Sequence, residues 1–214
     1  MTASGDPFPV SEFDNWAETY DQAVLDVSTF PFTGYDITLD TIVRMAKPHP
    51  GLCVLDLGTG TGNLAFPFSS AGCNLWCTDF SEAMLSRARK KLSNAHFFLH
   101  DLRLPLPHEL ERPFDRIVSA YVFHHFELDK KVSIIEGLCA HHLSSDGTIF
   151  IGDIAFPDTA GRDKLRAELD EKWEEEFYWL VDESVFALEK IGMRVRYEQV
   201  SSCAGVFVIR PASA

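Results

Sequence analysis

A glycine-rich turn directly after a short apolar run is the feature that most constrains the fold of this chain. Residues 52–57 are apolar apart from Asp56, and they lead into the sequence GTGTGN at 58–63. A short, nearly all-apolar run is typical of a buried strand in a parallel sheet. Glycine is favoured where the backbone turns with positive φ or approaches a ligand closely. The segment predicts a strand and turn at the carboxyl edge of such a sheet, where these folds bind ligands. A tight turn without a ligand is the alternative interpretation.

Further strand-like runs alternate with helix-like stretches along the chain. The predicted strands are 52–57, 74–78, 96–100, 114–119 and 148–154, and the helices between them are 62–70, 81–92 and 129–143. This alternation indicates parallel strands joined by crossover helices. Two final strands, 193–200 and 203–210, lie too close together for a crossover and must pair antiparallel. The predicted fold class is α/β, a doubly wound, mostly parallel seven-stranded sheet with a C-terminal antiparallel hairpin and helices on both faces.

Segments outside this alternation predict additional helices. Apolar spacing of three and four residues indicates helices over 11–27, 35–46 and about 182–190. Residues 158–180 are rich in charge and end in aromatic residues, so they form either a lid over the site or an amphipathic helix that completes the core. Pro67 predicts that the first crossover helix is kinked or starts late. A length of 214 residues favours a single domain, 1–214.

Composition excludes several classes of partner. The chain has 19 basic and 32 acidic residues, a net charge of −13 that repels nucleic acids and anionic membranes. Its five cysteines include no Cys-x-x-Cys pair, which fits free thiols in a reducing cytosol. It has no run of roughly 18 consecutive apolar residues, the length a membrane helix needs. We therefore expect a cytoplasmic protein with no nucleic acid, membrane or metal partner, and we make no prediction of its oligomeric state.

Two acidic residues end the next predicted strands. Asp79 follows the second strand and can accept hydrogen bonds from both hydroxyls of a ribose, a role that dinucleotide sites share. Asp101 follows the third strand. The glycine spacing is more selective, because the dinucleotide fingerprint is Gly-x-Gly-x-x-Gly. Here the glycines alternate, and the sixth place is Asn63.

These motifs resemble those of class I methyltransferases. The sequence DLGTGTGN at 56–63 resembles their motif D/E-x-G-x-G-x-G, and FDRIVSAYVFHHF at 114–126 is similar to their motif IV and the turn after it. The sequence WAETYD at 16–21 resembles W-A-x-T-Y-D, which small bacterial methyltransferases carry near the start together with F-H-H. The resemblance covers about residues 16–210. It implies an S-adenosylmethionine-dependent methyltransferase that acts on a small-molecule acceptor.

The resemblance also implies a cofactor site. The glycine loop would pack against the methionine part of S-adenosylmethionine, with Asp56 beside its amino-acid end, and Asp101 would accept from the adenine amino group. Helices within 1–50 would cover the cofactor, with Trp16 and Tyr20 facing its sulfonium cation. Alternatively, the two aromatic residues pack a leading helix on the sheet, and Asp101 caps a loop. The full predicted set is Trp16, Tyr20, Asp56, Gly58, Thr59, Gly60, Gly62, Asn63, Asp79, Phe80, Met84, Asp101, Leu102 and Ser119.

Two histidines are the candidates for catalysis. His124 and His125 follow the fourth strand, whose exit faces the transferring methyl group in the family that this chain resembles. Histidine suits proton removal near neutral pH, although either ring can instead cap the turn. Asp153 ends the fifth strand at the same rim and can contact a cationic or hydroxylated acceptor.

Two other functions remain open from the sequence. One is a protein that binds S-adenosylmethionine, or its demethylated product, without turnover. The other is a nicotinamide-dependent oxidoreductase, which the glycine spacing, Asp101 and the terminal hairpin disfavour. The sequence does not identify the methyl acceptor.

Overall fold

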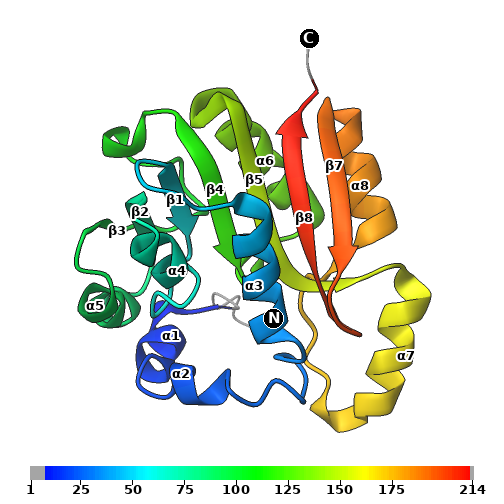
Figure 1. The fold of residues 1–214 in the computed structure, drawn as a ribbon. Coiled ribbons are helices and arrows are strands. Elements are labelled where there is room, and N and C mark those ends of the chain that lie inside the picture. Colours follow the sequence, from blue (N-terminus) through cyan, green and yellow to red (C-terminus); the bar gives the residue numbers. More distant parts are fainter. Residues whose placement is uncertain (1–7, 213–214) are drawn as a thin grey trace, which may run out of the picture.

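The computed structural model describes residues 8–212 and consists of one sheet with helices on both faces (Figure 1). The strands are β1 (Cys53–Leu57), β2 (Asn74–Asp79), β3 (Ala95–Leu99), β4 (Phe114–Ala120), β5 (Leu143–Phe156), β6 (Trp179–Leu180), β7 (Met193–Gln199) and β8 (Ala204–Pro211). Their order is β3-β2-β1-β4-β5-β8-β7, and β6 pairs with β5 off this path.

The pairing of the strands has two parts. Strands β1 to β5 pair only in parallel with one another, whereas β8 is antiparallel to both β5 and β7. The predicted α/β class and C-terminal hairpin are therefore confirmed. The two-residue strand β6 is an addition that the sequence did not predict.

Helices connect the strands and cover the sheet. They are α1 (Val10–Trp16), α2 (Tyr20–Ala23), α3 (Tyr35–Ala46), α4 (Ala65–Ser70), α5 (Glu82–Lys91), α6 (Leu128–His141), α7 (Thr159–Leu169) and α8 (Val181–Lys190). In Figure 1, α3 lies in front of the sheet, and α6 and α8 lie behind it. Helices α1 and α2 lie beyond the edge at which β4 and β5 end (Figure 1).

Alternating side chains of the central strands fill two hydrophobic clusters, one on each face of the sheet. Leu55 and Leu57 of β1 share a cluster with Ile135 of α6. Val54, the residue between Cys53 and Leu55, belongs to the other cluster with Ile42 of α3. This two-residue alternation follows from the pleat of a strand. It explains why β1 is apolar on both faces.

The starts of helices α5 and α4 are explained by a capping serine and by a proline, respectively. The Ser81 side chain accepts a hydrogen bond from the Met84 N–H at 3.1 Å, so it caps α5 as a serine does at a helix N-terminus. Helix α4 starts at Ala65, three residues later than predicted, which places Pro67 in its first turn. Proline is tolerated there because the first N–H groups of a helix have no partner within it.

The leading helical segment differs from the prediction. Instead of one helix over 11–27, α1 ends at Trp16 and the short α2 follows a tight turn. In that turn the Thr19 N–H donates to the Trp16 carbonyl at 3.0 Å. Asp21 of α2 then contacts Thr61 of the glycine loop and forms a 2.7 Å ion pair with Lys91. These contacts tie α2 to the glycine loop and to the end of α5. Within residues 8–212, no helix has the length and apolar character needed to span a bilayer.

Candidate functional site

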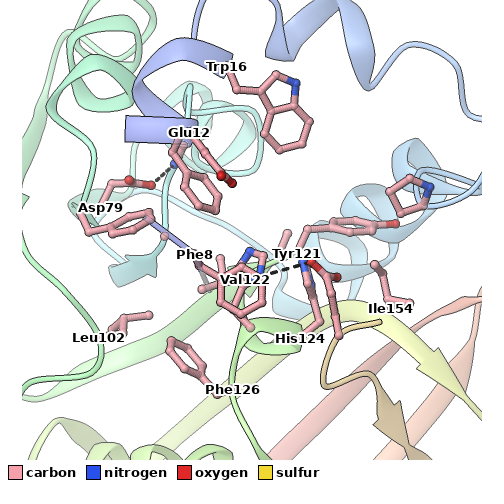
Figure 2. Close-up of a pocket in the computed structure, with 18 of the residues that line it drawn as sticks. Phe8, Glu12, Trp16, Asp79, Leu102, Tyr121, Val122, His124, Phe126 and Ile154 are labelled. Carbon is pink, nitrogen blue, oxygen red and sulfur yellow. Dashed lines mark hydrogen bonds and ion pairs between the residues drawn. The ribbon is translucent and has the colours of Figure 1, made fainter. Parts of the chain in front are cut away.

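A pocket of about 750 Å³ lies at the carboxyl edge of the sheet. The turns after β1 to β4, Ile154 of β5, the N-terminal helices and residues of 174–178 all contribute to its wall. Figure 2 shows Asp79 and Leu102 on one side of the pocket and Tyr121 and His124 on the other. The motifs after the separate strands therefore converge on one cavity.

The glycines after β1 have different surroundings. A Cβ added at Gly58 would lie 2.3 Å from Val122 Cγ2, so a side chain at that position is excluded. Gly62 is packed closely against Leu92 and Ala88. Gly60, at a φ of +55°, lines the pocket, and an added Cβ would meet no atom within 4 Å. At Gly60 the bare backbone therefore faces open space that a ligand can occupy.

Asp79 holds the glycine loop and lines the pocket. Its Oδ2 accepts the Gly60 N–H at 2.8 Å and its Oδ1 accepts the Ser81 N–H at 2.9 Å. Burial raises the pKa of Asp79 to about 6, although these hydrogen bonds act in the other direction. Each oxygen has a second lone pair, so the carboxylate can still accept from a ligand. Phe80 and Met84 continue the same wall.

Asp101 and Leu102 form the next part of the wall. Partial burial acts to raise the pKa of Asp101, but hydrogen bonds from Arg103 outweigh it and hold the pKa below the usual value. The Arg103 guanidinium lies 2.7 Å from Asp101 Oδ2. Asp101 is thus an ionised acceptor with an arginine partner.

Five of the predicted cofactor residues support the pocket from behind and are not part of its wall: Asp56, Thr59, Gly62, Asn63 and Ser119. The Ser119 hydroxyl donates to the Leu57 carbonyl at 2.8 Å, and the Asn63 amide donates to Asp21 at 3.2 Å. Asp56 is buried with no hydrogen-bond partner for Oδ2 among the described residues. Burial raises the pKa of Asp56 to about 7. The direct contacts predicted for these five residues remain predictions.

Aromatic residues of the N-terminal segment close the pocket from above the sheet edge. Trp16 and Tyr20 both line it, with their ring centroids 4.8 Å apart in an edge-on arrangement. Phe32 packs against both rings, at 6.0 Å from Trp16 and 6.3 Å from Tyr20. The two predicted aromatic residues are therefore brought to the same cavity as Gly58 and Gly60 of the glycine loop.

His124 is held by a buried carboxylate. Its Nδ1 lies 2.5 Å from Asp153 Oδ1, and its backbone N–H donates to Asp153 Oδ2 at 2.9 Å. The Trp179 indole N–H donates to the same Oδ2 at 3.0 Å. Burial acts to lower the pKa of His124, but the charge of Asp153 and the hydrogen bond to it raise the pKa above the usual value. Asp153 therefore fixes the orientation of the imidazole and does not itself line the pocket.

Glu176 joins the two histidines, which the sequence did not predict. One carboxylate oxygen lies 3.7 Å from His124 Nε2 and the other lies 3.7 Å from His125 Nδ1. Burial, together with the nearby His124 and Lys131, lowers the pKa of His125 to about 2. Lys131, which is buried on α6, donates to the Phe177 carbonyl and lies 4.4 Å from the centre of a Trp179 ring.

No local motif marks Glu176 or Lys131 in the sequence. Glu176 is one of three consecutive glutamates, and only the fold separates its surroundings from those of Glu174 and Glu175. Lys131 lies on a helix, where a lysine normally faces solvent. Both residues required the tertiary structure to be recognised.

Comparison with known proteins gives the family. Residues 54–147 match a family model described as a methyltransferase domain. The uncharacterized methyltransferase YrrT of Bacillus subtilis is 35% identical over 202 residues, which cover 87% of this chain and 90% of the relative. An uncharacterized methyltransferase of Anoxybacillus flavithermus is 34% identical over 166 residues, which cover 75% and 74%. This chain belongs to the methyltransferase family.

Solved structures share the fold of this methyltransferase. DhpI in complex with SAM and HEP aligns with a TM-score of 0.71 at 20% identity, over 94% of this chain and 95% of DhpI. The magnesium protoporphyrin IX methyltransferase ChlM of Synechocystis, with bound SAM, aligns with a TM-score of 0.68 at 17% identity, over 98% and 100%. The predicted class I methyltransferase fold is thus confirmed across nearly the whole chain.

Proposed function

We propose that this methyltransferase transfers a methyl group from S-adenosylmethionine to a small-molecule acceptor. The observation that carries the proposal is that a single pocket contains both the Gly60 and Asp79 loop and the His124 cluster. Its volume of about 750 Å³ is in the range of small-molecule sites. The SAM bound in fold relatives such as ChlM supports the choice of cofactor.

The cofactor side comprises the turns after β1, β2 and β3. Asp79 would bind the ribose, Asp101 the adenine amino group, and Gly60 offers the bare backbone that a close ligand needs. Trp16 and Tyr20 would face the sulfonium, which an aromatic face attracts. S-adenosylmethionine supplies an activated methyl group with a neutral leaving group, so the protein has mainly to align the reactants and exclude water.

The acceptor side comprises the turn after β4 and the segment 174–178. His124 and His125 would act here on the acceptor, since the other strand ends are assigned to the cofactor. Asp153 holds His124 so that Nε2 is directed away from the buried carboxylate, on the side of Glu176. In this arrangement the histidines contribute to turnover more than to cofactor affinity.

The segment 158–180 would cover the acceptor as a lid within one domain. Its residues Glu174, Glu176 and Tyr178 line the pocket, and the Phe177 N–H donates to the His124 carbonyl at 3.0 Å. The N-terminal helices would cover the cofactor in the same way. A cytoplasmic location is supported by five cysteines that are all free thiols.

Calorimetry with S-adenosylmethionine and S-adenosylhomocysteine tests the cofactor assignment. Both should bind, and Asp79→Asn should weaken binding by about 1–3 kcal/mol, the range for a lost hydrogen bond to an ionised acceptor. The exposed Asp146 provides a matched control, because Asp146→Asn removes the same charge away from the pocket. Absence of heat and of a thermal shift at millimolar ligand would refute the cofactor.

A metabolite screen with labelled S-adenosylmethionine then tests turnover. Transfer of label to a small molecule supports an enzyme, whereas tight binding without any transfer supports a non-catalytic binding protein. Binding of NAD in place of the sulfonium cofactor would support an oxidoreductase. With an acceptor in hand, His124→Gln and His125→Gln should each lower turnover and leave cofactor affinity unchanged. Normal turnover in both variants would reduce the histidines to structural residues.

A further inference from the structure

We propose that His124, His125 and Glu176 form a binding site for a divalent transition-metal ion, with zinc as the best-fitting ion. The three side chains lie on the acceptor side of the pocket and come from two segments about 50 residues apart in the sequence. Two imidazoles and one carboxylate are a ligand set that zinc accepts in proteins. The sequence alone predicted no metal site, because it did not place Glu176 beside the histidines.

The spacing of the three side chains fits one ion. Glu176 lies 3.7 Å from His124 Nε2 and 3.7 Å from His125 Nδ1, and one ligand atom from each residue lies within 4.8 Å of the others. Two ligands of a tetrahedral zinc ion, each bound at about 2.0–2.1 Å, are about 3.3 Å apart. Movements of a few tenths of an ångström would therefore bring Glu176 to coordination distance together with either histidine, whereas the two histidine nitrogens, which lie within 4.8 Å of each other, would have to approach by up to about 1.5 Å. The same 3.7 Å separations are too long for direct hydrogen bonds.

His125 has an unused ring nitrogen in this cluster. Its Nδ1 is buried and has no hydrogen-bond partner among the described residues. The rings of Phe8 and Phe13 pack on His125, with centroids at 4.3 and 5.5 Å, and these aromatic contacts offer the nitrogen no acceptor or donor. A buried polar atom without a partner is costly. Coordination by its lone pair would satisfy it.

His124 is prepared for coordination by Asp153. The Asp153 carboxylate accepts hydrogen bonds from the backbone N–H of His124 and from the indole N–H of Trp179. Because an ionised carboxylate can only accept, the close contact between Asp153 and Nδ1 of His124 requires that Nδ1 carry a proton. The lone pair of the neutral ring is then at Nε2, on the side of Glu176. A carboxylate that accepts from the far nitrogen of a ligand histidine is the usual support for such ligands, and it raises their basicity.

The charges of the buried cluster leave room for a cation. With His124 neutral, as a histidine that ligates a metal must be, Asp153 and Glu176 contribute two negative charges and Lys131 contributes one positive charge. Lys131 donates to the Phe177 carbonyl, so its ammonium is engaged at the edge of the cluster. A divalent ion between Glu176 and the histidines would compensate the remaining negative charge. It would also lie between the lone pair of His124 Nε2 and the Glu176 oxygen that faces it.

Three protein ligands leave a coordination position free, which is typical of catalytic zinc sites. All three ligands line the pocket, so an oxygen, nitrogen or sulfur atom of the acceptor can take that position. A metal ion lowers the pKa of a group bound to it. This role rests on the proposed function, and with an ion bound His124 serves as a ligand in place of a base. The binding of the ion itself depends on none of this.

Calorimetry with zinc on metal-stripped full-length protein, without S-adenosylmethionine, tests the site. We expect one ion per chain, with Glu176→Gln and His125→Gln each weakening the affinity at least 10-fold. Glu171→Gln and His141→Gln are matched controls, since both residues are exposed and neither lines the pocket or belongs to the cluster. Cobalt in place of zinc should give a tetrahedral visible spectrum, and that spectrum should be lost in His125→Gln.

Two results would overturn the site. One is the absence of stoichiometric binding at millimolar zinc. The other is binding that persists in the Glu176→Gln and His125→Gln variants, which would place the ion on other groups such as the five thiols. Thermal unfolding of each variant shows whether it is folded, and the Gln substitutions keep the side-chain volume. A failed zinc titration would not contradict the cofactor proposal, and a failure of S-adenosylmethionine to bind would not contradict the zinc proposal. The two proposals can therefore be tested separately.

Discussion

Gly60 and Asp79 show how two residues that are distant in sequence act as one unit. The Asp79 carboxylate accepts the Gly60 N–H, and both line the pocket. The carboxylate therefore fixes the backbone of the loop at the point where a Cβ would enter open space. A residue at position 60 is constrained by its backbone angle and would also be constrained by the cofactor proposed to fill the cavity.

Substitution of Gly60 by alanine should abolish tight cofactor binding. The new methyl group would project into the cavity that the cofactor is proposed to fill, so we expect at least a 10-fold loss of affinity for S-adenosylhomocysteine in calorimetry. Gly192→Ala is a matched control, because Gly192 also has positive φ and open space but lies away from the pocket. Both variants should lose about 1–2 kcal/mol of stability from the left-handed backbone. Equal affinity in the two would contradict the loop assignment.

Asp56 should make the free protein less stable as pH rises. Burial raises its pKa from the usual 3.8 to about 7 in the folded state, so the folded protein retains a proton that the unfolded chain loses. This contribution to stability is complete below about pH 4 and is lost as pH rises through about 7. Asp56→Asn should therefore gain about 1–3 kcal/mol relative to the wild type between pH 5 and pH 8.

Urea unfolding at the two pH values measures this gain. Asp146→Asn, which removes an acidic residue from the surface, controls for net charge. A difference between Asp56→Asn and wild type that does not change with pH would show that Asp56 ionises as readily in the folded as in the unfolded chain.

At the scale of elements, the segment that follows α7 is held by aromatic contacts. The Trp173 ring stacks on Phe30 with centroids 5.5 Å apart and also contacts Tyr178 at 5.1 Å. Phe30 and Tyr178 line the pocket, whereas Trp173 supports them from behind. The stack therefore joins the N-terminal segment to the segment proposed to cover the acceptor.

Removal of the Trp173 ring should loosen this cover. An aromatic pair contributes about 0.5–1.5 kcal/mol beyond its buried area, so the Phe177 amide, which donates to His124, should exchange about 2- to 10-fold faster in Trp173→Ala. Hydrogen exchange followed by mass spectrometry measures this. Phe186→Ala removes a 70% exposed ring on α8 and should leave the exchange unchanged. Unchanged exchange in both variants would show that the stack does not hold the segment.

The elements that could be predicted are those with a local signal. Strand β1 and the hairpin of β7 and β8 are encoded by an apolar run and by short spacing, and the structure has both. The break at Trp16 was missed because apolar spacing continues through it. After the break, Asp21 contacts the glycine loop, which is distant in sequence and which no local pattern could indicate.

The candidate site likewise contains residues that the sequence could predict and residues that it could not. The glycine loop and Asp79 were predictable because each follows a strand, and strand ends share one edge. The role of Glu176 was not predictable, because residues 174–176 are all glutamate. The pairing of β6 with β5 decides which of the three reaches the histidines. Strand β6 itself has only two residues, too few for a pattern.

At the scale of the whole molecule, the net charge of −13 and the acidic side chains of the pocket both repel anions. Acidic side chains also line the pocket, among them Glu12, Glu174 and Glu176. Within residues 8–212, the one lysine or arginine that lines the pocket is Arg103, and it is paired with Asp101. Both the overall field and the local field therefore disfavour a phosphate backbone in this pocket.

We accordingly expect no binding of DNA or RNA at physiological salt. Affinity for nucleic acids depends on cationic side chains that neutralise phosphates and release counterions, and it falls steeply as salt increases. The cluster Arg87, Arg89, Lys90 and Lys91 is the main local exception, but Arg89 and Lys91 are engaged by Glu82 and Asp21. Electrophoretic mobility of labelled duplex DNA and of single-stranded RNA measures binding, with Glu82→Gln as a variant that frees Arg89.

A shift of either nucleic acid by the wild-type protein at about 0.15 M salt would contradict the small-molecule assignment. A shift that appears only at low salt, and more strongly in Glu82→Gln, would indicate non-specific attraction to the basic end of α5. Methylation by the same preparations gives the final distinction, because a nucleic acid substrate would acquire label from S-adenosylmethionine, whereas nucleic acid bound only at α5 lies outside the pocket and would remain unlabelled.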